Sequence, residues 1–188
     1  QELSADILKQ PTLIDISPEQ LVATGVQQSA YEVDKEKKSA LLSHLILSKD
    51  WQQLLVFVRT KNGADNLVKK LVRDGISAAA IHGDKSQGVR TRTLESVKSN
   101  ELHGLVATEI AARGLDISGL PRVINCDLPK VPENYIHRIG RTGRASTEGE
   151  GLSLVSADEV KLLANIEALI GQTLTRTVAS DFIPAFKV

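Results

Sequence analysis

The sequence predicts a three-layer α/β domain with a mainly parallel central sheet. Apolar runs of strand length alternate along the chain with segments of helical periodicity, as in crossover units that build parallel sheets. The run LLVFV at 54–58 is apolar at every position, which is typical of a strand buried on both faces. Ligands of such sheets bind at the carboxyl ends of the strands, so the loops that follow strands are where a site is expected.

The individual elements follow from periodicity and from residues that end helices. Strands are predicted at 22–33, 54–58, 78–81, 105–108, 122–128 and 151–156. Helices are predicted at 2–10, 35–48, 63–74, 87–100, 133–139 and 157–171. Gly75 and Gly171 each follow a helical segment and are expected to end it. Pro132 lies where a helix start tolerates proline.

Composition excludes some classes of function. Lysine plus arginine and aspartate plus glutamate number 23 each, so the formal net charge is zero and a global basic field for nucleic acid is absent. Any site for a polyanion must therefore come from local clustering. Aromatic residues make up 3% of the chain, which disfavours a dedicated single-strand binder that stacks bases on aromatic rings.

The single cysteine, Cys126, excludes a disulfide within the chain and indicates a reducing compartment. Its flanks, VINCDLP, predict a small core residue near the end of a buried strand. No stretch approaches the roughly 20 apolar residues of a membrane span, and no signal segment opens the sequence. We therefore expect a cytoplasmic protein without membrane contact. The initial Gln1 and the lack of methionine predict a piece of a longer protein.

The segment YIHRIGRTGR at 135–144 contains three arginines, one histidine and no acid. Arg141 and Arg144 flank a threonine and Gly143, so a loosely restrained turn could aim both guanidinium groups at one target. Arginine presents a planar fork that matches phosphate oxygens and stays charged. A diphosphate or triphosphate is the natural target. The alternative is a surface cluster that pairs with acids elsewhere.

The segment LVATEIAARGLDI at 105–117 places a carboxylate after a strand. Gly114 would let the backbone approach a ligand closely, and Asp116 could accept hydrogen bonds from a ribose, as an acid does in dinucleotide-binding folds. The alternative is that Asp116 caps the start of a helix. Periodicity alone leaves the two interpretations open.

Two further loops follow strands and offer polar groups beside basic ones. RTKNG at 59–63 places Thr60 between Arg59 and Lys61, and HGDKSQGVR at 82–90 contains Gln87 and Arg90. Sugar hydroxyls and backbone phosphates are bound by this mixture. Gln87 and Arg90, three residues apart, share a helix face near its amino end, which suits phosphate. The alternative is a solvated helix start, and His82 alone is interpreted as a structural histidine.

Taken together, HGDKSQGVR, ARGLD and HRIGRTGR, which occur in this order along the chain as part of a longer motif set, resemble the second RecA-like domain of DEAD-box ATP-dependent RNA helicases. The resemblance covers residues 26–170. The strings LVFVRTKNGAD, AAIHGDKSQGVRTRTL, LVATEIAARGLDI and VPENYIHRIGRTGRA are most similar to the bacterial RhlE subgroup. The resemblance implies a RecA-like fold, ATP as cofactor and RNA as partner.

The resemblance also implies roles for the matching positions. Arg141 and Arg144 would be arginine fingers on the ATP phosphates, and Asp116 would hold the ribose. His137 and Arg138 would link the ATP site to the partner domain. Arg113 and Gly114 would lie between the ATP and RNA sites. The RNA sugar–phosphate track would be lined by Thr60, Gly83, Gln87, Arg90 and Thr108. Glu109 stands where the family more often has aspartate, and we expect no functional loss from that difference.

Two family motifs do not occur in this sequence, namely the GxxxxGK[ST] phosphate loop and the DEAD quartet. In the family both lie in the first domain, together with Mg²⁺, so the chain resembles half of a composite active site. Residues 1–16 would be the tail of the first domain and the linker, 17–171 the C-terminal RecA-like domain, and 172–188 a terminal extension. The partners would be RNA and the first domain, with the chain itself monomeric. A non-catalytic binding module and a DNA helicase are the alternatives.

Overall fold

The computed structural model describes residues 25–140, 149–186 and 188. Its strands are β1 (Gln27–Glu32), β2 (Leu54–Phe57), β3 (Ala78–Ile81), β4 (Gly104–Ala107), β5 (Arg122–Asn125), β6 (Glu150–Val155) and β7 (Thr175–Thr177). Its α-helices are α3 (Lys38–Lys49), α4 (Lys61–Arg73), α5 (Gln87–Lys98), α6 (Glu109–Ala112), α7 (Pro132–Ile139) and α8 (Val160–Ile170). None of these helices combines the length and the apolar character that crossing a bilayer requires.

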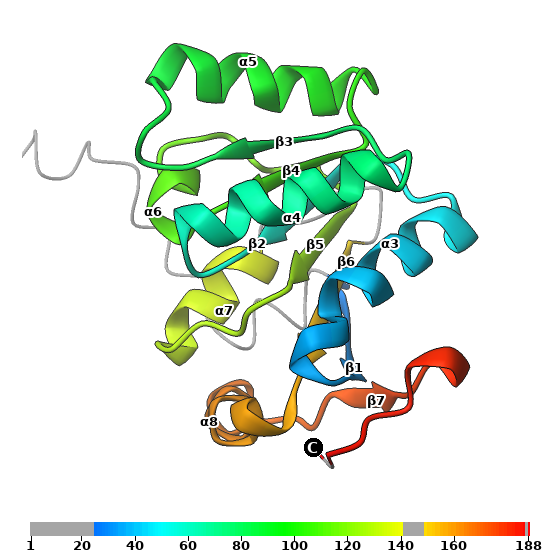
Figure 1. Ribbon diagram of the computed structural model, residues 1–188. Coiled ribbons are helices and arrows are strands. Elements are labelled where there is room, and N and C mark those ends of the chain that lie inside the picture. Colours follow the sequence, from blue (N-terminus) through cyan, green and yellow to red (C-terminus); the bar gives the residue numbers. More distant parts are fainter. Residues whose placement is uncertain (1–24, 141–148, 187) are drawn as a thin grey trace, which may run out of the picture.

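The strands of these ranges form one sheet in the order β3-β4-β2-β5-β6-β1-β7 (Figure 1). Every strand pair in it is parallel. β1 therefore lies beside the edge strand β7, the chain then crosses to the middle at β2 and on to the opposite edge at β3, and β4, β5 and β6 fill the places between these strands. The predicted parallel sheet is confirmed.

Helices cover both faces of the sheet, which gives three layers. On β2, Leu54 and Val56 pack into a core with α3 and α4, whereas Leu55 and Phe57 pack into a second core with α5, α6, α7 and α8. All four side chains are buried. An apolar run without alternation is therefore explained by a strand that contributes to two cores at once.

Most predicted elements are confirmed, with corrections at their ends. The 78–81 strand has the predicted bounds, but the strand expected at 122–128 ends at Asn125. The amides of Cys126 and Asp127 both donate to the carbonyl oxygen of Phe57, at 3.0 and 3.3 Å, so the chain leaves the ladder there. Cys126 is buried, as predicted. The short helix α6 follows Thr108 and is not among the predicted helices, and the helix predicted at 2–10 lies outside the described residues.

The segment 172–188 contributes β7, which pairs with β1 and which the sequence pattern did not indicate. Its three residues are polar and exposed, so they form no apolar run. Arg176 forms ion pairs with Glu32 and Glu167. The Asp34 carboxylate accepts hydrogen bonds from the backbone amides of Ala185 at 3.0 Å and Phe186 at 3.4 Å. Hydrogen bonds and charge pairs thus hold this segment against the domain.

Candidate functional site

The carboxyl ends of three adjacent strands bring separate candidate residues together. Thr60, Gly83 and Thr108 follow β2, β3 and β4 by one to three residues, and β4 lies between the other two strands. The amide of Thr108 donates to the carbonyl of Ile81 at 3.3 Å. Residues far apart in the sequence therefore lie side by side at the carboxyl-terminal edge of the sheet, which is where parallel sheets bind ligands.

Two helices begin at this edge with side-chain caps. The Thr60 hydroxyl accepts a hydrogen bond from the amide of Gly63 at 3.0 Å at the start of α4. The Ser86 hydroxyl accepts from Val89 at 3.2 Å at the start of α5. An accepting hydroxyl keeps its own proton for donation, so Thr60 can still donate to a phosphate oxygen.

The first turn of α5 presents the two residues predicted to share a face. Gln87 is its first residue and is exposed. Arg90 is partly buried, and its Nε donates to the carbonyl oxygen of Lys85 at 3.1 Å. Within the described residues, no hydrogen bond engages its two terminal guanidinium nitrogens, which can meet an anion at the amino end of the helix, where the helix dipole favours negative charge.

His82, buried directly after β3, holds the loop that leads to α5. Its Nδ1 accepts a hydrogen bond from the amide of Asp84 at 3.3 Å. Because Nδ1 accepts, the proton lies on Nε2, which is 3.1 Å from Oδ1 of Asp65 on α4. Lys61 at the start of α4 and Asp84 in the same loop form an ion pair at 3.2 Å, a second link between α4 and this loop. The structural interpretation of His82 is confirmed.

Asp116 lies in a loop beyond Gly114, whose φ of +78° favours glycine. No helix starts at Asp116 in the described chain, which instead continues through a turn into β5, so the helix-capping alternative is wrong. The hydroxyl of Ser118 and its amide, the latter at 3.2 Å, donate to Oδ1. Lys98 of α5 donates to the backbone carbonyl of Asp116 at 2.7 Å. The side chain is 78% exposed, so a ribose can reach it. Arg113 is also exposed.

Arg138 is buried, and its guanidinium contacts the protein on several sides. Nε donates to Glu109 at 2.5 Å, and Nη1 donates to Oδ1 of Asn125 at 2.9 Å and to the carbonyl of Asp127 at 3.2 Å. The group also lies 4.5 Å from the centre of the Phe57 ring, a cation–π distance. Burial lowers the pKa of Arg138, and the Glu109 carboxylate opposes this shift. Arg138 therefore braces α7 against α6 and β5.

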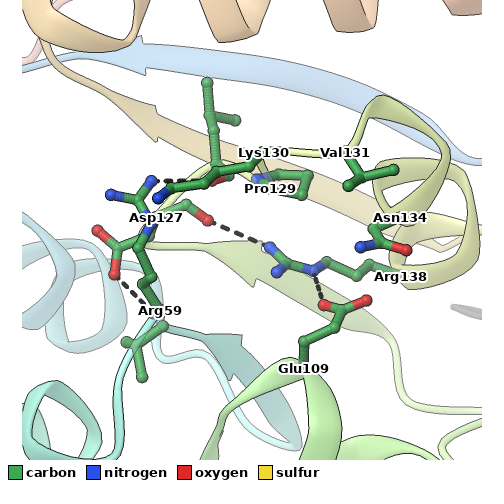
Figure 2. Close-up of a pocket in the computed structure, with 10 residues that line it drawn as sticks. Arg59, Glu109, Asp127, Pro129, Lys130, Val131, Asn134 and Arg138 are labelled. Atoms are coloured by element: carbon green, nitrogen blue, oxygen red, sulfur yellow. Dashed lines mark hydrogen bonds and ion pairs between the residues drawn. The ribbon is translucent and has the colours of Figure 1, made fainter.

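A pocket that was not predicted from the sequence lies beside Arg138. Its volume is about 210 Å³, and its lining is formed by Val58, Arg59, Glu109, Asp127, Leu128, Pro129, Lys130, Val131, Asn134 and Arg138 (Figure 2). The pocket lies where β2 and β5 end and α7 begins. A signal was present in the sequence, because Arg59 and Lys130 are cations that follow predicted strands.

The structure describes α7 up to its last residue, Ile139, and the following Gly140. His137 is partly buried on this helix. Arg141 and Arg144 lie outside the described residues, so the role predicted for them stays a prediction. Among the residues that are described, no three His, Cys, Asp or Glu side chains gather where they could hold a metal ion.

Comparison with known proteins agrees with this architecture. The helicase conserved C-terminal domain family matches residues 36–146. The chain is 42% identical over 171 residues to the ATP-dependent RNA helicase RhlB of Pseudomonas putida, which covers 91% of this chain and 43% of the relative. It is 37% identical to the DEAD-box ATP-dependent RNA helicase CshA of Geobacillus kaustophilus, over 94% of this chain and 38% of the relative. The chain thus spans less than half the length of these curated relatives.

Solved structures agree as well. The Escherichia coli DEAD-box protein SrmB, bound to the regulator of ribonuclease activity A, superposes with a TM-score of 0.81 at 34% identity, covering 87% of this chain and 96% of that one. A DEAD box protein from Methanococcus jannaschii gives a TM-score of 0.76 at 36% identity, over 83% of this chain and 43% of that one. The RecA-like fold is thereby confirmed. The chain belongs to the helicase conserved C-terminal domain family, in the form that DEAD-box proteins carry.

Proposed function

We propose that this chain is the C-terminal half of an ATP-dependent RNA helicase, and that it supplies arginine fingers and part of the RNA track for local unwinding or remodelling of RNA duplexes. The observation that carries the proposal is the alignment of Thr60, Gly83 and Thr108 along one sheet edge. Arg90 and Gln87 extend this row at the start of α5. The names of the relatives support the same activity.

The chemistry of this row suits the sugar–phosphate backbone of RNA rather than its bases. It offers a hydroxyl at Thr60, an amide at Gln87 and a guanidinium at Arg90. Groups of this kind position a nucleic acid without reading its sequence. Gly83 contributes exposed backbone, with open space where a side chain would be. We therefore expect weak binding of single-stranded RNA without sequence preference.

ATP would be held mainly by the first domain, with Mg²⁺ bound there as well. This chain offers a group that fits the ribose of the nucleotide, because the exposed Asp116 carboxylate can accept hydrogen bonds from the ribose hydroxyls. Arg113 and Gly114 would connect this ribose contact to the RNA row. ATP supplies the phosphoryl group that is transferred to water. Arg141 and Arg144 would stabilise the charge that develops on it.

Further assignments belong to the same proposal. The four motif strings favour the RhlE subgroup, while the relatives compared above are named RhlB and CshA. Residues 1–16 are assigned to the linker and first-domain tail, 17–171 to the domain proper and 172–188 to a terminal extension. The parent protein is proposed to be cytoplasmic, and this chain to be a monomer.

Strand separation by the intact parent helicase tests the proposal. RNA duplexes and DNA duplexes of equal sequence are compared, with ATP and without it, alongside the 188-residue chain alone. We expect ATP-dependent separation of the RNA duplex by the intact protein, and no phosphate release by the chain alone. Separation of only the DNA duplex would contradict the proposed substrate. Phosphate release by the chain alone, abolished by Arg141→Ala, would contradict the composite site.

A further inference from the structure

The pocket beside Arg138 has unbalanced positive charge. Three cations and two carboxylates line it, so its formal charge is +1. Glu109 is neutralised by Arg138 at 2.5 Å, and the Asp127 carboxylate accepts a hydrogen bond from the backbone amide of Arg59 at 2.8 Å. Across residues 25–140 and 149–186, no acidic side chain forms an ion pair with the guanidinium of Arg59 or the ammonium of Lys130.

The protein orients the first of these two cations. Nη2 of Arg59 donates to the carbonyl oxygen of Leu128 at 3.3 Å, which directs the guanidinium across the loop that carries Lys130. Pro129 lies between the two loop residues and restricts the backbone there. In Figure 2 the side chains of Arg59 and Lys130 reach toward the same end of the pocket. Like charges held near each other repel, and a bound anion would remove that cost.

The position of the pocket indicates which anion it meets. Arg59 directly precedes Thr60, and Glu109 directly follows Thr108, so the pocket adjoins the row of proposed RNA contacts. A volume of about 210 Å³ is below the range of roughly 300–1,000 Å³ that holds a whole small-molecule ligand. It has room for a phosphate group. A backbone phosphate carries one negative charge, which matches the formal charge of +1, whereas a nucleoside triphosphate carries several.

We propose that Arg59 and Lys130 form a phosphate subsite that continues the RNA track beyond Thr60 and Thr108 toward α7. The inference rests on the proposed RNA-binding function and adds a contact to it. The amide of Asn134 on the wall of the pocket supplies a neutral donor for the remaining phosphate oxygen. Each phosphate neutralised on a single strand contributes about −0.7 to the slope of log affinity against log salt. Each contact is thus worth roughly fivefold in affinity at 0.1 M salt.

Fluorescence anisotropy of the 188-residue chain with a labelled oligouridine, across a salt series, tests the subsite. The variants are Arg59→Gln, Lys130→Gln and the double variant. Lys130→Gln breaks no hydrogen bond within the described chain, so its effect is separable from any change in folding. Lys161→Gln, an exposed lysine on α8, is the matched control. Arg90→Ala reports on the row of RNA contacts itself, and thermal melting verifies the fold of each variant.

We expect the double variant, which removes the whole subsite, to weaken RNA binding roughly fivefold at 0.1 M salt and to make the salt slope shallower by about 0.7. Each single variant should weaken binding by less than the double variant, and Lys161→Gln should leave it unchanged. If Arg90→Ala weakens binding but the pocket variants do not, the subsite is wrong and the RNA track stands. If none of these variants weakens binding, the proposed RNA function of this edge fails with it. A parallel titration with ATP and inorganic phosphate distinguishes the sources, because a loss of ATP affinity with RNA affinity unchanged would overturn the RNA assignment.

Discussion

Arg138 of α7 and Glu109 of α6 form an ion pair in which Nε and Oε2 are 2.5 Å apart. The arginine side chain is 6% exposed and the glutamate side chain 25% exposed. The pair joins the helix that leads to Arg141 and Arg144 with the segment that follows Thr108. The pair therefore joins the residue that follows Thr108 to the helix that precedes the proposed fingers in the sequence.

Glu109→Ala should destabilise the fold markedly. The substitution leaves the buried Arg138 guanidinium without its counter-charge, and breaking such a pair costs about 3 kcal/mol. Guanidinium chloride unfolding measures the loss. Glu95→Ala, at an exposed position on α5, is the control and should change stability by less than about 0.5 kcal/mol. Equal stability of the two variants would show that Arg138 does not depend on Glu109.

Gly151→Ala should also destabilise, by a different mechanism. A Cβ atom at Gly151 on β6 would lie 2.6 Å from Cγ2 and 2.8 Å from Cδ1 of Ile139, a side chain that is fully buried. Overpacking of this kind costs about 1–3 kcal/mol. Gly88→Ala on α5 is the control, because a Cβ there meets nothing within 4 Å and alanine favours helix. A Gly151→Ala protein as stable as the Gly88→Ala protein would mean that Ile139 moves without cost.

Arg141→Ala in the intact helicase should lower kcat strongly while ATP affinity changes less. A finger acts mainly on charge that develops in the transition state, and removing one costs roughly 10³–10⁵ in rate. Steady-state ATPase with saturating RNA gives kcat, and equilibrium titration of a fluorescent nucleotide gives affinity. An unchanged kcat with a lower melting temperature would favour the surface-cluster interpretation of the arginines.

Stability should fall above pH 9 because of Cys126. Burial raises the pKa of its thiol from an ordinary 9.0 to about 12. Between these values the unfolded chain releases a proton that the folded chain keeps, so rising pH favours unfolding. One pH unit above the unfolded pKa, the loss is about 1.4 kcal/mol.

The measurement for this prediction is the denaturation midpoint at pH 8 and at pH 10. Cys126→Ala removes the thiol and should show a smaller decrease than the original protein. Burial also raises the pKa of Tyr135, but both proteins carry that residue, so its contribution cancels in the comparison. Identical pH dependence in the two proteins would contradict the assignment to Cys126.

The sequence alone determined the class of fold and nearly all of the larger elements. The apolar run at 54–58 is a local signal, because burial on both faces of a sheet requires apolar residues at every position. Gly75 and Gly171 are likewise local signals, since a helix commonly ends at a residue in the left-handed conformation, which glycine adopts without strain; both have positive φ. The two short elements, α6 and β7, carry no such signal because neither has an apolar period of its own.

Only the tertiary structure decided which of these segments meet. Nothing local to Glu109 indicates Arg138 as its partner, 29 residues away, and nothing local to Arg59 places it opposite Lys130. The Arg138–Glu109 pair and the shared pocket of Arg59 and Lys130 both follow from the strand order β3-β4-β2-β5, which sets the ends of β2, β4 and β5 beside one another. The periodicity of apolar residues predicts which face of each segment is buried, but not which other segment covers that face. The order of parallel strands is decided by packing among all of them, and so are the pairing of Arg138 and the pocket beside it.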